Sequence, residues 1–171
     1  MLFRSSQAGL VQATDGNFYG TTLNGGANNL GTIFEITPEG DLTTLHTFYS
    51  TNGALPYGGL LQATDGEFYG TTFTGGPHNY GTVFRLSVGL GPFVETLPTS
   101  GKVGAFVKIL GSNLTGVSSV TFNGTPAAFA VSSSSESEIS TTVPAGATSG
   151  KVQVVTPSGT LSSNLPFRVL L

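Results

Sequence analysis

The sequence contains an internal repeat, in which residues 9–36 align without a gap with residues 59–86 at a period of 50 residues. The first copy reads GLVQATDGNFYGTTLNGGANNLGTIFEI, and the second reads GLLQATDGEFYGTTFTGGPHNYGTVFRL. Most positions are identical, and apolar positions that differ, such as Ile33 and Val83, stay apolar. A repeat of this length is typical of propellers and solenoids, so it limits the folds open to this chain more than any other feature.

The first copy predicts a small antiparallel sheet of short strands. We expect these strands, in chain order, at 10–13, 18–23, 32–37 and 42–49. Asp15-Gly16 lies between the first two strands and favours a type I′ hairpin turn, because both residue types accept a positive φ. Four strands in about 50 residues match one blade of a β-propeller.

The second copy begins like the first but does not reach a fourth strand, because after Leu86 the chain turns into a different sequence. Conversely, Met1–Arg4 resembles the end of a fourth strand that precedes the first copy. Residues 1–91 are therefore predicted to hold two propeller-blade-like antiparallel units, of which the second is truncated. Two blades cannot close a ring of about four to eight. We expect the exposed edge strands to be covered by another chain, by a segment absent here or by the second domain.

A long motif is shared by the two copies, over residues 9–45 and 59–86: Gly-Leu-Val-Gln-x-x-Asp-Gly-x-Phe-Tyr-Gly-Thr-Thr, followed by Gly-Gly and Gly-Thr-Val-Phe. This motif resembles that of the bacterial GloVer tandem repeats. The resemblance implies long secreted, propeller-like arrays with no assigned chemistry. This chain departs from that pattern in having only about two units.

Residues 92–171 contain no copy of the repeat and predict a second all-β domain. Strand candidates follow one another about every ten residues, at 106–110, 119–122, 128–131, 138–143, 152–156 and 165–169. This spacing is typical of a β-sandwich. Asn123-Gly124 favours a hairpin turn directly after Phe122.

Short motifs in this segment occur in the order and spacing of the IPT/TIG domain, which they resemble: 98–101, 111–114, 120–124, 143–146, 150–154 and 156–159. The resemblance implies an immunoglobulin-like sandwich that acts as a spacer, an adhesion unit or an appendage beside glycan-active enzymes. Members that bind DNA do so through basic loops, which this segment lacks. Its basic residues are only Lys102, Lys108, Lys151 and Arg168, and we expect no nucleic-acid partner.

Composition excludes several kinds of site. The chain has no cysteine, which excludes disulfides, thiolate metal sites and cysteine nucleophiles. It has no run of about 18 apolar residues, so we expect no membrane span. Charged residues make up 9%, and such polar, uncharged surfaces are common in secreted bacterial proteins. We expect an extracellular or cell-surface location, with an export signal that is not present in this chain.

The titratable residues do not form a catalytic or metal-binding signature. His46 has no counterpart in the second copy, and His78 stands where the first copy has Asn28, so the plain interpretation of both histidines is an exposed polar position. Asp15 and Asp65 each precede a glycine, which favours capping of turn N–H groups, with calcium binding as the weaker alternative. No calcium-loop, phosphate-loop or G-x-S-x-G motif is present. We expect no cofactor and no catalytic residue, and favour a protein that is not an enzyme.

Aromatic residues are the candidates for ligand binding. Phe18-Tyr19 and Phe68-Tyr69 recur in the two copies, and neighbouring side chains on a strand face opposite sides. One ring of each pair is therefore core, and the other can line a surface that suits a sugar. The candidate residues are Tyr19, Tyr69, Tyr57, Tyr80, Asn28 and His78. Packing between blades explains the repeated rings equally well.

We therefore predict a non-catalytic secreted or cell-surface structural or adhesion module that acts through protein or surface contacts. One alternative is a carbohydrate-binding accessory region of a secreted polysaccharide-active protein, and another is a small hydrolase with an unrecognised site. The expected partners are a second copy, bound through the exposed repeat edge strands, and a polysaccharide or cell-surface protein.

Overall fold

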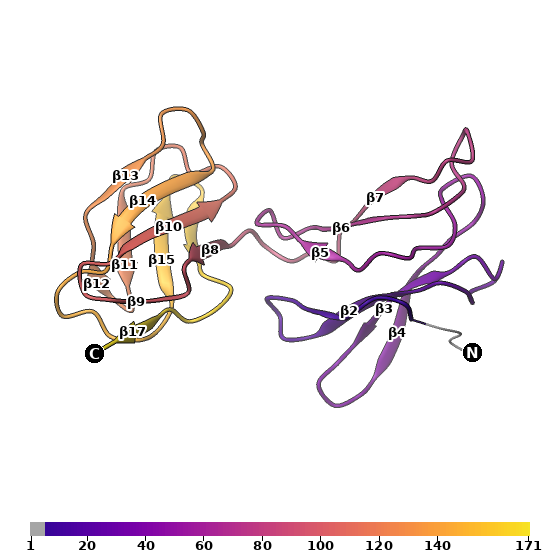
Figure 1. Ribbon diagram of the computed structural model, residues 1–171, viewed down its shortest axis with the longest axis horizontal. Helices are drawn as coiled ribbons and strands as arrows, with labels where there is room; N and C mark the ends of the chain where they lie inside the picture. Colours follow the sequence, from indigo (N-terminus) through magenta and orange to yellow (C-terminus); the bar gives the residue numbers. More distant parts are fainter. Residues whose placement is uncertain (1–5) are drawn as a thin grey trace. The chain divides into compact units, whose positions relative to one another are not determined.

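The computed structural model describes residues 6–171, and within this range every regular element is a β-strand. The predicted all-β fold class is confirmed. The chain divides into two compact units, one ending at Leu90 and one running from Gly91 to Leu171 (Figure 1). The fourth-strand remnant expected at Met1–Arg4 lies outside the described residues.

The first repeat forms one antiparallel sheet in the order β1-β2-β3-β4. Its strands are β1 (Val11–Gln12), β2 (Phe18–Thr22), β3 (Thr32–Ile36) and β4 (Leu42–Thr47). Each strand lies within the range predicted for it. In the register of this sheet Tyr19 lies opposite Glu35, and Thr21 lies opposite Ile33. These four side chains therefore share one face of the sheet.

The second repeat forms a three-stranded antiparallel sheet in the order β5-β6-β7. Its strands are β5 (Leu61–Gln62), β6 (Phe68–Thr71) and β7 (Val83–Leu86). The register repeats that of the first sheet, because Tyr69 lies opposite Arg85 and Thr71 lies opposite Val83. The predicted truncation after the third strand is confirmed. Within the described residues, β7 pairs along one edge only, whereas its counterpart β3 pairs along both.

The hairpin turn between β1 and β2 differs from the predicted type. Ala13 N donates to Asn17 O at 2.9 Å and Gly16 N donates to Ala13 O at 3.0 Å. Gly16 alone takes a positive φ, of 90°, and Asp15 does not. This is a type I turn followed by a left-handed glycine, so the predicted type I′ turn is wrong. The reason is the strand register: Gln12 pairs with Phe18, which leaves a loop too long for a two-residue turn.

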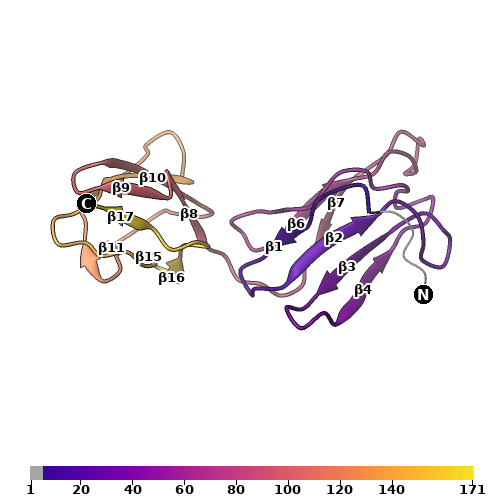
Figure 2. The same ribbon diagram turned by 60° about the horizontal axis from the view of Figure 1, so that its bottom comes forward.

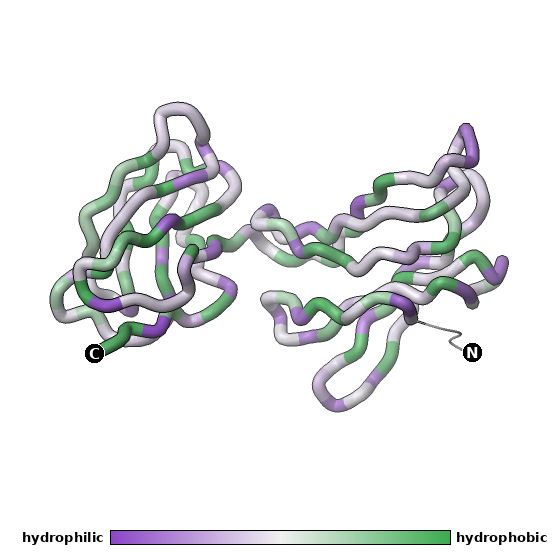
Figure 3. Tube along the Cα trace, viewed as in Figure 1, coloured by the Kyte–Doolittle hydropathy of each residue, from purple (hydrophilic) through white to green (hydrophobic). Residues whose placement is uncertain are grey.

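The two sheets of the first unit pack face to face (Figures 1 and 2). The ring of Tyr19 on β2 lies 4.4 Å from that of Phe68 on β6, centroid to centroid. The rings of Phe48 and Phe84 lie 5.2 Å apart. Hydrophobic and hydrophilic residues are interspersed along the trace (Figure 3). The buried residues of this core are Ala13, Tyr19, Ile33, Phe48, Leu60 and Phe68.

The second unit consists of two four-stranded sheets and one short strand pair. The sheets have the orders β13-β14-β10-β8 and β12-β11-β15-β16, and β17 pairs with β9 in parallel. The strands are β8 (Val94–Leu97), β9 (Ser100–Lys102), β10 (Phe106–Gly111), β11 (Ser119–Phe122), β12 (Thr125–Pro126), β13 (Phe129–Val131), β14 (Glu138–Thr142), β15 (Val152–Thr156), β16 (Gly159–Ser162) and β17 (Arg168–Leu170).

Alternating apolar residues from both four-stranded sheets fill the core of the second unit. Val107 and Ile109 of β10 are buried, as are Val152 and Val154 of β15. This arrangement is the predicted immunoglobulin-like sandwich.

In the second unit the predicted hairpin turn is confirmed, but the last strand begins later than predicted. Asn123 and Gly124, with φ of 46° and 86°, form the predicted two-residue turn. The last strand begins at Arg168 instead of 165. Pro166 precedes it and has no N–H to donate to a neighbouring strand.

Candidate functional site

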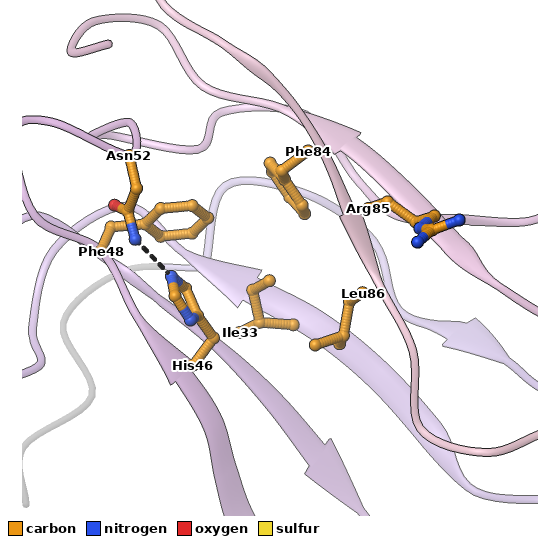
Figure 4. Close-up of a pocket in the computed structure, with 7 residues that line it drawn as sticks. All are labelled: Ile33, His46, Phe48, Asn52, Phe84, Arg85 and Leu86. Atoms are coloured by element: carbon orange, nitrogen blue, oxygen red, sulfur yellow. Dashed lines mark hydrogen bonds between the residues drawn. The ribbon is translucent and has the colours of Figure 1, made fainter.

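A cleft of about 210 Å³ lies between the two sheets of the first unit (Figure 4). Its walls come from β3, from β4 and the loop after it, and from β7. The lining residues are Ile33, His46, Phe48, Asn52, Phe84, Arg85 and Leu86. Most of this lining is apolar, because the sheets meet through their apolar faces.

Of the two titratable residues that line this cleft, His46 is partly buried and Arg85 is exposed. Asn52 Nδ2 lies 3.0 Å from His46 Nε2; an amide NH₂ only donates, so Nε2 accepts and the ring carries its proton on Nδ1. The imidazole packs edge-on against Phe48, with ring centroids 4.9 Å apart. Burial lowers the pKa of His46, which favours the neutral ring. The interpretation of His46 as an exposed polar residue is therefore wrong.

The chemistry open to this cleft is narrow. Among the described residues that line it there is one imidazole and one guanidinium, from Arg85, and no carboxylate. Glycoside hydrolysis needs two carboxyl groups that flank the bond. The cleft therefore suits apolar contacts with one neutral hydrogen-bonding group, and it does not present a hydrolytic pair.

Asp15 and Asp65, the weak calcium candidates, have local partners. Asp15 Oδ1 accepts from Asn17 N at 3.0 Å, and Asp65 Oδ1 accepts from Glu67 N at 2.9 Å. The second oxygen of each accepts from a tyrosine hydroxyl four residues on. Both carboxylates cap their turns, as predicted, and also fix a tyrosine. Within residues 6–171 no cluster of three or more histidines and carboxylates is arranged to hold a metal ion.

The repeated tyrosines have different environments. Tyr19 is buried, and its hydroxyl also donates to Glu35 Oε1 at 3.2 Å. Burial, with the hydrogen bond to Asp15, raises its pKa far above the ordinary value. A buried ring offers no face to a sugar, so the structure removes Tyr19 from the candidate surface. Tyr69 is partly exposed; its hydrogen bond to Asp65 raises its pKa, against an opposing effect of Arg85.

Three exposed aromatic residues on the second repeat, Tyr57, Phe73 and Tyr80, form what we call the aromatic patch. The rings of Tyr57 and Phe73 meet edge to face, with centroids 5.5 Å apart. Tyr80 is 91% exposed. The bond from Thr72 N to Thr82 O, 2.9 Å long, keeps the chain around Phe73 beside the chain around Tyr80.

Phe73 was absent from the sequence-based candidates, although a signal for it exists. The first repeat has Leu23 and Leu30 where the second has Phe73 and Tyr80. Both changes from leucine to an aromatic residue fall in loops that the structure places together. A comparison restricted to conserved positions of the repeat overlooks them.

Asn28 and His78 occupy corresponding positions in the two repeats, and both are exposed. Asn28 Nδ2 donates to Phe48 O at 3.3 Å, so its side chain ties the loop to the end of β4. His78 lies in the loop that carries Tyr80. Of the polar candidates, His78 is therefore the one on the same loop as part of the aromatic patch.

Sequence profiles of two families match the chain. The profile described as Gloeobacter/Verrucomicrobia repeat matches residues 3–125, and that of the IPT/TIG domain matches residues 93–169. The first match extends beyond the repeats and overlaps the second over residues 93–125. No curated protein matches the chain. Across residues 6–171 no helix is long and apolar enough to cross a membrane.

Proposed function

The chain belongs to the Gloeobacter/Verrucomicrobia repeat family and carries an IPT/TIG domain, and from this premise we propose that it is a structural or adhesion module of the cell surface or the extracellular space. Domains of these two kinds are generally non-catalytic structural or adhesion modules. The proposed module acts through contacts with a protein or with another surface.

The observation that carries this proposal is the aromatic patch. Tyr57, Phe73 and Tyr80 expose large rings to solvent, which is costly unless a partner covers them. Aromatic residues are also the side chains that most often supply binding energy at protein interfaces. The residues that line the cleft of the same unit include no pair of carboxylates that could act as a hydrolytic pair.

Retention of the purified chain on isolated bacterial cell envelopes tests the proposal. We expect the wild-type chain to be retained, and the double variant Tyr57→Ala/Tyr80→Ala to lose at least tenfold in apparent affinity, which equals about 1.4 kcal/mol. Tyr49→Ala is the matched control, because Tyr49 lies in the first repeat and is about as exposed as Tyr57. Equal retention of all three proteins, or no retention of the wild type, would contradict the proposal.

A carbohydrate-binding accessory role is the second candidate, and the paired rings of Tyr57 and Phe73 favour it. A flat apolar ring with polar neighbours suits the face of a sugar. In this case the chain should bind at least one insoluble polysaccharide in a pull-down assay, and protease treatment of envelopes should leave binding intact. Tyr57→Ala, which removes one of the paired rings, should weaken this binding. Absence of binding to a broad polysaccharide panel excludes this candidate.

A further inference from the structure

Corresponding residues of the two repeats are buried on opposite faces of their sheets. Leu60 of the second repeat is 9% exposed, whereas its counterpart Leu10 is 51% exposed. Ile33 of the first repeat is 2% exposed, whereas its counterpart Val83 is 78% exposed. The two sheets have the same strand register. The repeats therefore stack in the same orientation, with one face of the first against the opposite face of the second.

Among residues 6–171, this stacking leaves two different faces exposed. The open face of the second repeat carries Leu61, Tyr69, Thr71 and Val83, which correspond to the covered Val11, Tyr19, Thr21 and Ile33. The outer face of the first repeat carries Leu10, Gln12 and Phe18, which correspond to the covered Leu60, Gln62 and Phe68. Each uncovered face is thus a copy of one side of a contact that the chain already makes.

The existing contact between the repeats is specific in both its apolar and its polar parts. The ring of Tyr19 stacks on Phe68, and Gln62 exchanges two hydrogen bonds with Thr14, each 3.1 Å long. The open face of the second repeat and the outer face of the first carry the same residue types, since Tyr69 repeats Tyr19 and Phe18 repeats Phe68. Gln12 repeats Gln62 and is exposed, with its amide donating to Gly16 O in its own turn.

We propose that the open face of the second repeat in one copy of this chain binds the outer face of the first repeat in another copy. The occupant is a second copy, because the contact within the chain already joins these two kinds of face. The sequence that follows β7 does not supply a third repeat, since the second unit begins at Gly91.

The proposed contact is heterologous, which means that the two surfaces that meet are different. It replaces the edge-strand pairing expected from the sequence by packing of sheet faces. Heterologous contacts extend head to tail and produce either closed rings or open chains. If the repeats arrange as propeller blades, closure at about four to eight blades needs two to four copies.

Two variants with opposite defects test this inference by light scattering. Val83→Asp places a charge on the open face of the second repeat, and Leu10→Asp places one on the outer face of the first. Each variant keeps the other face intact, and both positions are exposed, so neither change disturbs the core. We expect the wild type to form particles heavier than the 17.5 kDa chain, and each variant alone to be a monomer.

A mixture of the two variants gives the decisive result. One intact face of each kind remains in the mixture, so we expect a 1:1 dimer of twice the monomer mass that does not grow further. Val103→Asp, which changes an exposed valine of the second unit, is the matched control and should assemble like the wild type. A variant that fails to fold is recognised by its circular dichroism, and Thr71→Lys then replaces Val83→Asp.

Three outcomes would overturn the inference. The first is a wild type that is monomeric at all concentrations. The second is assembly that Leu10→Asp leaves unchanged, which would indicate pairing of two open faces or of two β7 edges. The third is a mixture of the two variants that remains monomeric.

Discussion

Replacement of Phe68 by alanine should destabilise the first unit far more than the same replacement of Phe18, although both residues occupy the same position of the repeat. Phe68 is fully buried between the sheets and stacks on Tyr19, whereas Phe18 lies on the outer face and is partly exposed. Truncation of a buried phenylalanine costs about 3–5 kcal/mol, because it removes apolar burial and leaves a cavity. For a half-buried ring we expect about 1 kcal/mol.

Urea unfolding followed by tyrosine fluorescence measures this difference. All five tyrosines lie in the first unit and the chain has no tryptophan, so the signal reports on that unit alone. With a slope of about 1–1.5 kcal/mol per molar urea, Phe68→Ala should lower the midpoint by about 2 M or more. Phe18→Ala should lower it by less than about 1 M. Both variants are measured with Val83→Asp present, so that association between copies does not contribute.

Equal destabilisation by the two replacements would refute the stacking described here. A cost of less than about 1.5 kcal/mol for Phe68→Ala would refute it too, since it would place Phe68 outside the core.

Three further expectations concern the first unit and use the same unfolding assay. Gln62→Ala should cost about 0.5–1.5 kcal/mol, because it removes two hydrogen bonds to Thr14, whose exposed groups can then bond to water. Gln12→Ala, at an exposed position, should cost almost nothing; equal costs would contradict the bridge between the repeats. Gly16 and Gly81 both have a positive φ. Gly16→Ala should cost about 1–2 kcal/mol of stability from backbone strain alone. Gly81→Ala should cost at least twice as much, because the added Cβ would also meet the backbone of Thr72 and Phe73. Burial lowers the pKa of His46 below 6.5, so the unfolded state binds the proton more readily and the free energy of unfolding should fall as the pH drops below about 6.5. His46→Gln should reduce this loss of stability; an equal loss between about pH 7.5 and about pH 5.5 in the variant and the wild type would contradict the assignment.

Strand positions in the repeats could be predicted from the sequence because the turn residues between them carry a clear signal. Gly16 and Gly40 take the positive φ that other residues avoid, and the strands begin and end beside such turns. In the second unit, β8, β9, β12 and β16 were missed. They lack the alternation of several apolar residues with polar ones that identifies strands such as β15.

Burial within the repeats could not be predicted, because identical residues have opposite environments. Phe18-Tyr19 and Phe68-Tyr69 share one local sequence, yet Tyr19 is buried in the first repeat and Phe68 in the second. The alternation of a strand shows that the two rings face opposite sides. Only the stacking of the sheets decides which side is covered. The same limit explains why Tyr19 was a candidate for a surface that it does not reach.

The candidate surfaces were predictable in part. The sequence identified Tyr57 and Tyr80, which are exposed, but not Phe73, because its counterpart in the first repeat is Leu23. The cleft around His46 is lined by residues of β4 and β7, which are distant in the sequence. No pattern within one repeat contains that information.

Cross-linking between single-cysteine variants tests the central claim of face-to-face stacking between copies most directly. The chain has no cysteine, so Leu10→Cys and Val83→Cys each introduce one thiol, and a bismaleimide of about 10 Å spans the distance between packed sheets. We predict a cross-linked dimer when the two variants are mixed, and none from either variant alone. A dimer from Val83→Cys alone, or no product from the mixture, would contradict the account.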